Sequence, residues 1–425
     1  MDVLPNDLVA NVLGRLAPCS LAASRCVRKA WRAIVDARRL LRTDLLPLRL
    51  DGFFCCGQIL LPRPHFFSRP SIGRRIGGGL DLLDTHDDMD LQIMDHCNGL
   101  LLLYNCERVV NPATRQWAHI PPSLHPCRGM EDFYADYCLI YDPIVSPHYK
   151  VFMIPLVPVT LSSNSKFKED SEWPSSPYTT HLFSSKNGRW EEKSFIREGD
   201  AAGTIADMLP DRRQFQRHAI YMRGVLYVHC QNDSVMRITL SDDEYQMIKS
   251  PVESKIVDNG VFYLGKSEKG VYFALLWGDR WPQFRVWLLN ESCGQMEWLL
   301  KSDTSLQEVV QNFPFNIDNK YSRPWIVNYV KDVKEAQVEE ESEWDFDNGI
   351  VLETKAKVET DHQETFFLGF HPYKEIAFFW VSHTRVVSYH LNSSKVQELG
   401  ILHVPSIMKS FPYTPCMLEV EQGVF

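Results

Sequence analysis

A short acidic group in this 425-residue chain is a first candidate for metal binding. Asp84, Asp87, Asp88 and Asp90, with His86 among them, could hold a hard cation, because such ions prefer carboxylate oxygens. The group lacks the glycine and the bidentate glutamate of an EF-hand loop. We therefore expect an exposed acidic loop at this position and no metal.

The cysteines and the common catalytic motifs give no stronger signal. Cys55 and Cys56 are adjacent and cannot easily form a disulfide with each other, so we expect two small buried side chains. The sequence at His96 and Cys97 has no third ligand nearby, and no CxxC pair or zinc-type spacing is present. Motifs of the GxSxG, GxxxxGKS/T, HExxH and GxGxxG types are also absent. The sequence thus predicts a protein that is not an enzyme and needs no cofactor.

Charge divides the chain into two parts. The net charge is −9, yet the first 50 residues carry +5, so an acidic body follows a basic module. This balance excludes a general nucleic-acid binder, and no apolar run is long enough to cross a membrane. The N-terminus has no basic region of the secretory type, so we expect an intracellular protein of the cytoplasm, the nucleus or both. The acidic run 331–347 predicts a solvated insertion between strands.

Apolar residues in the first 45 positions recur at helical spacing and predict three short helices. Asn6 can cap the first of them. A module of this size seldom holds a core large enough to stand alone, so we expect a partner to cover part of its apolar surface. The two apolar stripes are Leu8, Val12, Leu13 and Leu16, and Val27, Trp31, Ile34 and Val35.

From about residue 95 the pattern becomes that of short β-strands bounded by Gly, Asn or Asp. Clear strands lie within 98–104, 223–230, 259–265, 269–277 and 366–370. Four further segments, 109–121, 181–195, 286–300 and 386–402, each contain a strand, a polar turn and a second strand that opens on Trp or an aliphatic residue. This degenerate repeat predicts an antiparallel β domain, most simply a β-propeller, with a β-sandwich as the alternative.

The predicted fold class is therefore α+β with more than one domain. A three-helix module at 1–45 precedes a connecting segment at 46–93 and a mainly antiparallel β domain at 94–425. The uneven spacing of the repeat leaves the number of blades open, and the chain has no diglycine of the kelch type.

Two parts of the sequence resemble known plant proteins. Residues 4–35 resemble the F-box, and residues 97–122, which read Cys-Asn-Gly-Leu-Leu and then Asn-Pro-Ala-Thr-Arg-Gln-Trp, resemble the opening of the F-box-associated domain. Beyond residue 125 only the strand pattern continues. The F-box matches are Leu4-Pro5, Leu8, Val12-Leu13, Arg15-Leu16, Leu21, Arg25-Cys26-Val27 and Lys29 through Trp31-Arg32.

The resemblance implies a substrate-recognition subunit of a Skp–cullin–F-box ubiquitin ligase. Its F-box would bind a Skp-family adaptor, and through it cullin and RING subunits, while the β domain would recruit an unknown target protein for ubiquitination and degradation. The alternative is an adaptor-bound scaffold outside any ligase. No nucleic acid or membrane is implied as a partner. The adaptor-binding residues that the resemblance transfers to this chain are Leu4, Pro5, Leu8, Val12, Leu13, Leu16, Leu21, Val27 and Trp31.

Two sets of residues keep two interpretations. Leu13, Val27 and Trp31 could contact an adaptor, fill the core of their own module, or do both. Four tryptophans lie in polar, proline-rich or acidic segments and could contact the target, because aromatic residues on loops often anchor interfaces. Packing within the blades explains them equally well. These tryptophans are Trp173, Trp281, Trp325 and Trp344.

Overall fold

The computed structural model describes most of the chain between residues 5 and 419. The residues within these limits that it does not describe are 17–20, 22–23, 26, 39, 42–47, 58–62, 70–75, 77–79, 81–82, 84–90, 105–106, 124–126, 128, 163–164, 209–217, 253–259, 279–280, 293–295, 314–324, 328–343 and 353–364. The predicted acidic group at 84–90 and most of the predicted insertion at 331–347 lie outside the described residues. Among the described residues, no helix has the length and apolarity that crossing a membrane requires.

The N-terminal module is helical, as the sequence predicts. Helix α1 spans Asn6–Gly14 and helix α3 spans Lys29–Ala37, and four residues between them, Leu21, Ser24, Arg25 and Val27, are also helical. The N-cap residue of α1 is Pro5 and makes no side-chain capping bond, so the predicted cap at Asn6 is wrong. Asn6 is instead the first residue within the helix.

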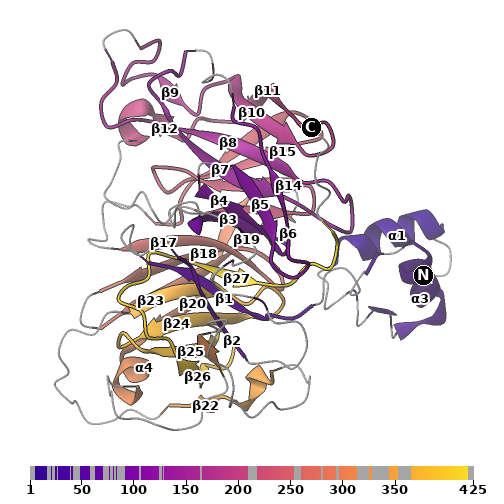
Figure 1. The fold of residues 1–425 in the computed structure, drawn as a ribbon, viewed down its shortest axis with the longest axis vertical. Coiled ribbons are helices and arrows are strands. Elements are labelled where there is room, and N and C mark those ends of the chain that lie inside the picture. Colours follow the sequence, from indigo (N-terminus) through magenta and orange to yellow (C-terminus); the bar gives the residue numbers. More distant parts are fainter. Residues whose placement is uncertain are drawn as a thin grey trace.

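Six sheets form most of the rest of the described chain (Figure 1). The first five follow one another in sequence, and within each of these four-stranded units the strands are antiparallel neighbours in chain order. The second and third units are joined into one eight-stranded sheet by a short parallel pairing of β11 with β16. Their strands are β3 (Ile93–Cys97), β4 (Leu100–Leu103), β5 (Arg108–Asn111) and β6 (Gln116–His119); β7 (Tyr134–Ile140), β8 (Lys150–Leu156), β10 (Tyr178–Ser184) and β11 (Arg189–Glu198); β13 (Ala219–Met222), β14 (Val225–His229), β15 (Val235–Thr239) and β16 (Glu244–Ile248); β17 (Val261–Ser267), β18 (Gly270–Trp277), β19 (Gln283–Asn290) and β20 (Glu297–Ser305); and β23 (Thr365–Phe370), β24 (Ile376–Val381), β25 (Arg385–His390) and β26 (Lys395–Ile401).

The sixth sheet joins distant parts of the chain. Its order is β27 (Lys409–Tyr413), β1 (Gly52–Cys56), β2 (His65–Ser68) and β21 (Ile326–Val327). Strand β1 pairs along its whole length with β27, so the first strand of the β domain is held by the last. The segment 46–93 is therefore more than the connecting segment that the sequence predicts. Its strands β1 and β2 are short and pair with each other, but their outer partners, β27 and β21, lie hundreds of residues away, which hides the sheet from a local pattern.

The six sheets are arranged as the blades of a β-propeller. Their first strands contact one another in the order β3, β7, β13, β17, β23 and β27. A hydrogen bond from Lys409 Nζ to the Met94 carbonyl (3.5 Å) and a ring contact between His96 and Phe411 close this circle. Six apolar clusters fill the spaces between neighbouring sheets all the way round. Because each sheet packs both faces against neighbours, a two-layer sandwich is excluded.

The predicted repeat corresponds to the third and fourth strands of a blade. The second residue of the fourth strand in the first five sheets is Trp117, Trp190, Tyr245, Trp298 and Val396 in turn. Two of the tryptophans donate a hydrogen bond to a carbonyl just beyond the preceding sheet: Trp190 to Pro121 (2.6 Å) and Trp298 to Lys249 (2.9 Å). The repeat looked irregular in the sequence because Tyr245 replaces Trp in the third blade and an extra segment widens the second.

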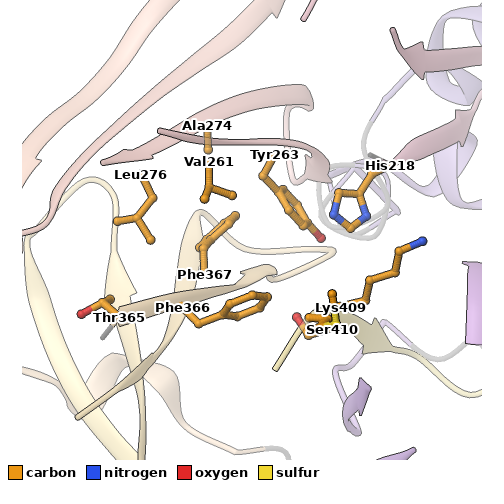
Figure 2. A pocket seen from close by; sticks show the side chains of 11 residues that line it. His218, Val261, Tyr263, Ala274, Leu276, Thr365, Phe366, Phe367, Lys409 and Ser410 are labelled. Carbon is orange, nitrogen blue, oxygen red and sulfur yellow. The ribbon is translucent and has the colours of Figure 1, made fainter. Parts of the chain in front are cut away.

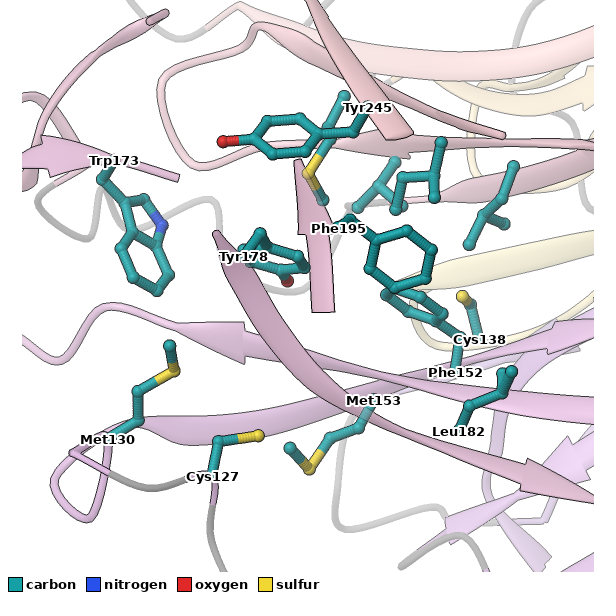
Figure 3. Packing of buried hydrophobic residues seen from close by; sticks show 14 of the residues in the cluster. Cys127, Met130, Cys138, Phe152, Met153, Trp173, Tyr178, Leu182, Phe195 and Tyr245 are labelled. Atoms are coloured by element: carbon teal, nitrogen blue, oxygen red, sulfur yellow. The ribbon is translucent and has the colours of Figure 1, made fainter. Parts of the chain in front are cut away.

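That extra segment carries small elements of its own. The two-stranded sheet of β9 (Glu172–Trp173) and β12 (Gly203–Thr204) leads into the short helix η3 (Ile205–Met208). Trp173 packs there against Phe133, with ring centroids 4.9 Å apart, and belongs to the cluster between the second and third blades (Figure 3). The remaining elements are α4 (Gln307–Asn312), η7 (Phe346–Asn348) and β22 (Ile350–Val351), which pairs with β26.

The two faces of the ring carry different loops. On one face, here called the short-turn face, tight turns such as 98–99 and 223–224 join first strands to second strands. The chain enters β1 on this face, where the Asp51 amide donates to the Tyr413 carbonyl (2.9 Å). On the opposite, long-loop face lie the connections that carry β9, β12, η3 and α4. Figure 1 shows the helical module on the right and these elements on the left.

Candidate functional site

The helical module divides its apolar residues between a small core and its surface. Leu13, Leu21 and Val35 are buried together, and Trp31 and Leu16 are partly buried against them. The second group consists of Leu8, Val12 and Val27, whose exposed fractions are 53%, 59% and 64%. The predicted stripe on the first helix is thus split between the two groups.

Helix geometry explains the split along α1. Leu8 and Val12 are four residues apart and therefore lie on one side of the helix, while Val9, Leu13 and Leu16 follow the adjoining side that packs inward. Aliphatic side chains that stay in water at successive helix turns lack the favourable free energy of burial. A row of them therefore favours an interface with a partner. This outward side of α1 is the candidate site of the module.

The structure places the predicted adaptor residues in three environments. Pro5, Leu8, Val12 and Val27 are exposed, Leu16 and Trp31 are half-buried, and Leu13 and Leu21 are buried. Leu4 lies outside the described residues. The core interpretation therefore accounts for Leu13, whereas Val27 has no core to reach.

Ion pairs hold the charged residues of the module in place. Arg25 binds Asp36 through two nitrogens, at 2.6 and 3.1 Å, and Arg38 pairs with Asp7 across the two helices. The hydrogen bond from Arg25 lowers the pKa of Asp36. Water reaches all four side chains, so solvent screening keeps the contribution of each pair to stability small.

The four candidate tryptophans do not form a common surface. Trp173 and Trp325 are only 3% and 1% exposed, so they belong to the core and cannot make direct contact with a target. Trp344 is half-buried, packs edge-on against Trp325, and donates to Gln397 Oε1 (3.3 Å). Trp281 is half-buried on the connection between β18 and β19. Packing within and between blades thus explains two of the four directly.

The adjacent cysteines considered for nucleophilic chemistry pack inside the β domain. Cys55 and Cys56 are buried in the sixth blade, and burial raises the pKa of both thiols, that of Cys56 to about 11. Within the described residues, no three His, Cys, Asp or Glu side chains gather closely enough to hold a metal ion.

Titratable residues do gather along the central channel. Three cavities, of about 40, 60 and 20 Å³, all have His218 in their walls. Burial lowers the pKa of His218 well below its usual value, and burial together with Lys266 lowers that of His96 to about 3. Both imidazoles are therefore neutral at pH 7. Burial raises the pKa of Asp95 to about 7.

The channel has one lysine near each end. Lys266 lies in β17 near its end at the short-turn face and donates to Asn98 Oδ1 (2.9 Å). Lys409 begins β27 on the side of the long-loop face. These two lysines carry no signal in the sequence, because they lie on separate strands that come together only when the ring closes.

Comparison with known proteins agrees with this architecture. Residues 1–43 match the model of the F-box domain. The Arabidopsis thaliana F-box protein At5g07610 is 24% identical over 340 residues, which cover 74% of each chain. The putative F-box protein At5g15660 from the same plant is 24% identical over 316 residues, which cover 70% of this chain and 64% of that one.

A third relative, the putative F-box/kelch-repeat protein At1g20940 of Arabidopsis thaliana, is 30% identical over 124 residues, or 27% of this chain and 28% of that one. Together, these matches cover both the helical module and much of the β domain. The helical module is therefore an F-box domain, and the chain is similar to F-box proteins of Arabidopsis thaliana.

Proposed function

We propose that this chain is the substrate-recognition subunit of a Skp–cullin–F-box ubiquitin ligase and works in the cytoplasm, the nucleus or both. An F-box implies in general that a Skp-type adaptor is bound, and F-box proteins generally serve as adaptors or receptors. The adaptor would connect the chain to cullin and RING subunits, while the propeller holds a target protein. Its contribution is positional, because tethering raises the effective concentration of target lysines near the enzyme that carries ubiquitin.

The observation that carries this proposal is the exposed apolar side of α1. Leu8 and Val12 remain more than half exposed although the same helix buries Leu13. A fully buried aliphatic side chain is worth roughly 1.5–3 kcal/mol, so covering two that are half exposed gives on the order of 2 kcal/mol. Val27 adds to this surface. The F-box thus presents apolar surface that the propeller does not cover and that a partner can bury.

The arrangement of the two domains supports a receptor role. The chain passes from the F-box into β1 on the short-turn face of the propeller, whereas the long connections lie on the opposite face (Figure 1). Loops on a rigid scaffold commonly carry binding residues. A target on the long-loop face would therefore leave the F-box free to hold its adaptor.

The test replaces Leu8 and Val12 with aspartate in the full-length chain. We expect at least a tenfold loss of affinity for a purified Skp-family adaptor, because a tenfold change needs only about 1.4 kcal/mol and each aspartate would also have to lose water on binding. Titration calorimetry measures the loss. The unfolding temperature of the propeller should not change, since both residues lie on the surface of the other domain.

The matched control is Val145→Asp, which places the same charge at an exposed aliphatic residue of the propeller. This variant should bind the adaptor as the wild type does. Unchanged adaptor binding by the Leu8 and Val12 variant would refute the docking surface. If the adaptor binds but no cullin co-purifies, the chain is an adaptor-bound scaffold and the ligase assignment fails.

A further inference from the structure

One of the three channel cavities combines an apolar wall with a single cation. This cavity of about 40 Å³ lies among the starts of β17, β23 and β27 and the end of β18, on the long-loop side of the channel. Figure 2 shows the side chains that line it. We call it the mouth cavity. Its lining residues are His218, Val261, Tyr263, Ala274, Leu276, Thr365, Phe366, Phe367, Met408, Lys409 and Ser410.

Most of the wall of the mouth cavity is apolar, and Thr365 adds a buried hydroxyl that has no hydrogen-bond partner within the part of the chain that the structure describes. Val261 and Tyr263 come from the fourth blade and Phe367 from the fifth, and the rings of Tyr263 and Phe367 meet edge to face at 4.8 Å. The hydroxyl of Ser410 is occupied because it donates to the Leu368 carbonyl. His218 is neutral for the reason given above. An occupant would therefore be apolar over most of the space that it fills, with one polar contact open to it at the Thr365 hydroxyl.

Lys409 supplies the positive charge at the edge of this apolar space. Its ammonium makes a long hydrogen bond of 3.5 Å to the Met94 carbonyl and lies close enough to the buried Asp95 to lower the pKa of that carboxyl. No salt bridge to Lys409 is found among the described residues. A cation beside an apolar cavity is complementary to a molecule that carries an aliphatic group and a carboxylate close together.

The volume of the cavity limits the size of the apolar group. A single water needs about 10–15 Å³ on this measure, so 40 Å³ holds roughly three or four heavy atoms. That is the size of a Val or Leu side chain and is too small for an aromatic ring. In an extended peptide, residues two apart point to the same side. An acidic side chain two residues from the aliphatic one could therefore reach Lys409 while the aliphatic group fills the cavity.

We propose that the mouth cavity binds an extended segment of the target protein that presents an aliphatic residue two positions from a glutamate or aspartate. This inference rests on the proposed function, since it places the target on the face that points away from the F-box. The aliphatic side chain packs against Val261, Tyr263 and Phe367, and the carboxylate pairs with Lys409.

The cavity at the other end of the channel provides an internal contrast. It is larger, about 60 Å³, and its lining includes Asp95, His96, Asn98, Lys266 and Thr414. That lining is more polar, and its lysine already donates to Asn98. It also opens beside the F-box side of the ring. Lys266 is therefore the matched control for Lys409: both are channel lysines, and only one borders an apolar cavity.

The test uses the full-length chain and a library of extended decapeptides with degenerate flanks. Four sets differ only at two fixed positions: Leu-x-Glu, Leu-x-Gln, Ala-x-Glu and Leu-x-Lys. We expect the Leu-x-Glu set, or its reverse order, to bind at least tenfold more tightly than the other three sets. Fluorescence anisotropy of the pooled and then the individual peptides measures these affinities.

Substitutions then assign the preference to the mouth cavity. Lys409→Met should remove the preference for glutamate over glutamine, and Lys409→Glu should reverse it toward lysine. Val261→Phe should weaken binding of leucine peptides at least tenfold by filling the cavity. Lys266→Met should leave all four affinities unchanged. Thermal unfolding shows whether each variant remains folded, and Lys409→Met and Lys409→Glu provide two independent readouts if Val261→Phe does not fold.

Several results would overturn the inference. They are equal binding of the four sets, a glutamate preference that survives Lys409→Met, and a preference lost in Lys266→Met. Binding of free isovalerate as tight as that of the peptides would assign the cavity to a small organic acid instead of a target protein. Adaptor binding is measured on the same variants. If the wild-type chain does not bind the adaptor, the proposed function is wrong. The peptide preference of the mouth cavity is then judged separately from it.

Discussion

At the scale of single residues, the channel contains a carboxyl group whose charge state is set by burial. Asp95 is buried on β3, and its Oδ2 accepts a hydrogen bond from the Leu139 amide (2.7 Å). Burial raises its pKa to about 7, against the opposing effects of this bond and of Lys409. The folded protein therefore holds a proton at Asp95 between about pH 4 and pH 7, whereas the unfolded chain releases it.

This difference predicts how Asp95 changes the stability with pH. Because the folded state binds the extra proton, the contribution of Asp95 to the free energy of unfolding is greatest below about pH 4 and falls as the pH rises to about 7. Asp95→Asn should remove this dependence. Between pH 4 and pH 8, the free energy of unfolding of the variant should rise by on the order of 4 kcal/mol relative to that of the wild type. Urea unfolding at both values measures it, and a difference that does not change with pH would show that the folded carboxyl titrates normally.

At the scale of elements, the pairing of β1 with β27 closes the ring. Gly52 begins β1 opposite Tyr413 and Ser68, and a Cβ atom built on it would lie 2.6 Å from the Phe67 carbonyl oxygen. Backbone fills the space that a side chain would need. The absence of a side chain at Gly52 is thus a packing requirement of the sixth blade.

Gly52→Ala tests whether this region is a blade or a connecting segment. We expect a loss of about 1–3 kcal/mol in the free energy of unfolding, because the new methyl group must displace β2. In a flexible connection the same change would be neutral or slightly stabilising. The control is Gly14→Ala in α1, where the nearest atom to the added methyl is 4.0 Å away. That change should be neutral or stabilise the F-box by up to about 1 kcal/mol. Chemical denaturation measures both variants.

At the scale of the whole molecule, the two domains have separate cores of unequal size. Among the residues of the F-box that the structure describes, the fully buried core consists of Leu13, Leu21 and Val35. The propeller has six clusters that connect each blade to the next around the circle. Since each blade of such a ring depends on both neighbours, we expect the propeller to unfold as one unit and the F-box to unfold at lower temperature.

Scanning calorimetry of the full-length chain should therefore show two transitions. Leu13→Ala should lower the midpoint temperature of only the smaller, earlier transition. The shift should correspond to a loss of about 2–5 kcal/mol in the free energy of unfolding of the F-box. Phe54→Ala, in the sixth blade, should lower the midpoint temperature of only the main transition. The shift should correspond to a loss of about 3–5 kcal/mol in the free energy of unfolding of the propeller. A saturating Skp-family adaptor should raise the earlier transition alone. A single transition that both variants shift would show that the domains fold as one unit.

The sequence by itself predicted the helical module, the antiparallel β domain and the paired strands that recur through it. These features follow from local patterns: helical spacing around Leu13 and Val35, and apolar strands that end in polar turns. The segment around Asn111 illustrates this. Its Asn-Pro turn was visible in the sequence, and in the structure Asn111 Oδ1 accepts from the Ala113 amide (3.1 Å). The side-chain nitrogen of Asn111 also donates to the Cys416 carbonyl (3.0 Å), a contact that no local pattern could show.

Only the tertiary structure decided the number of blades, the role of residues 52–68, and which apolar residues face outward. Long-range pairing sets the first two, because β1 and β2 have no sequence neighbour to complete their sheet and must join β27 and β21. Packing sets the third: Leu8 and Leu13 are chemically alike, and only the position of the second and third helices buries one and leaves the other exposed. The mouth cavity belongs to the same class, because Val261, Phe367 and Lys409 become neighbours only when the ring closes.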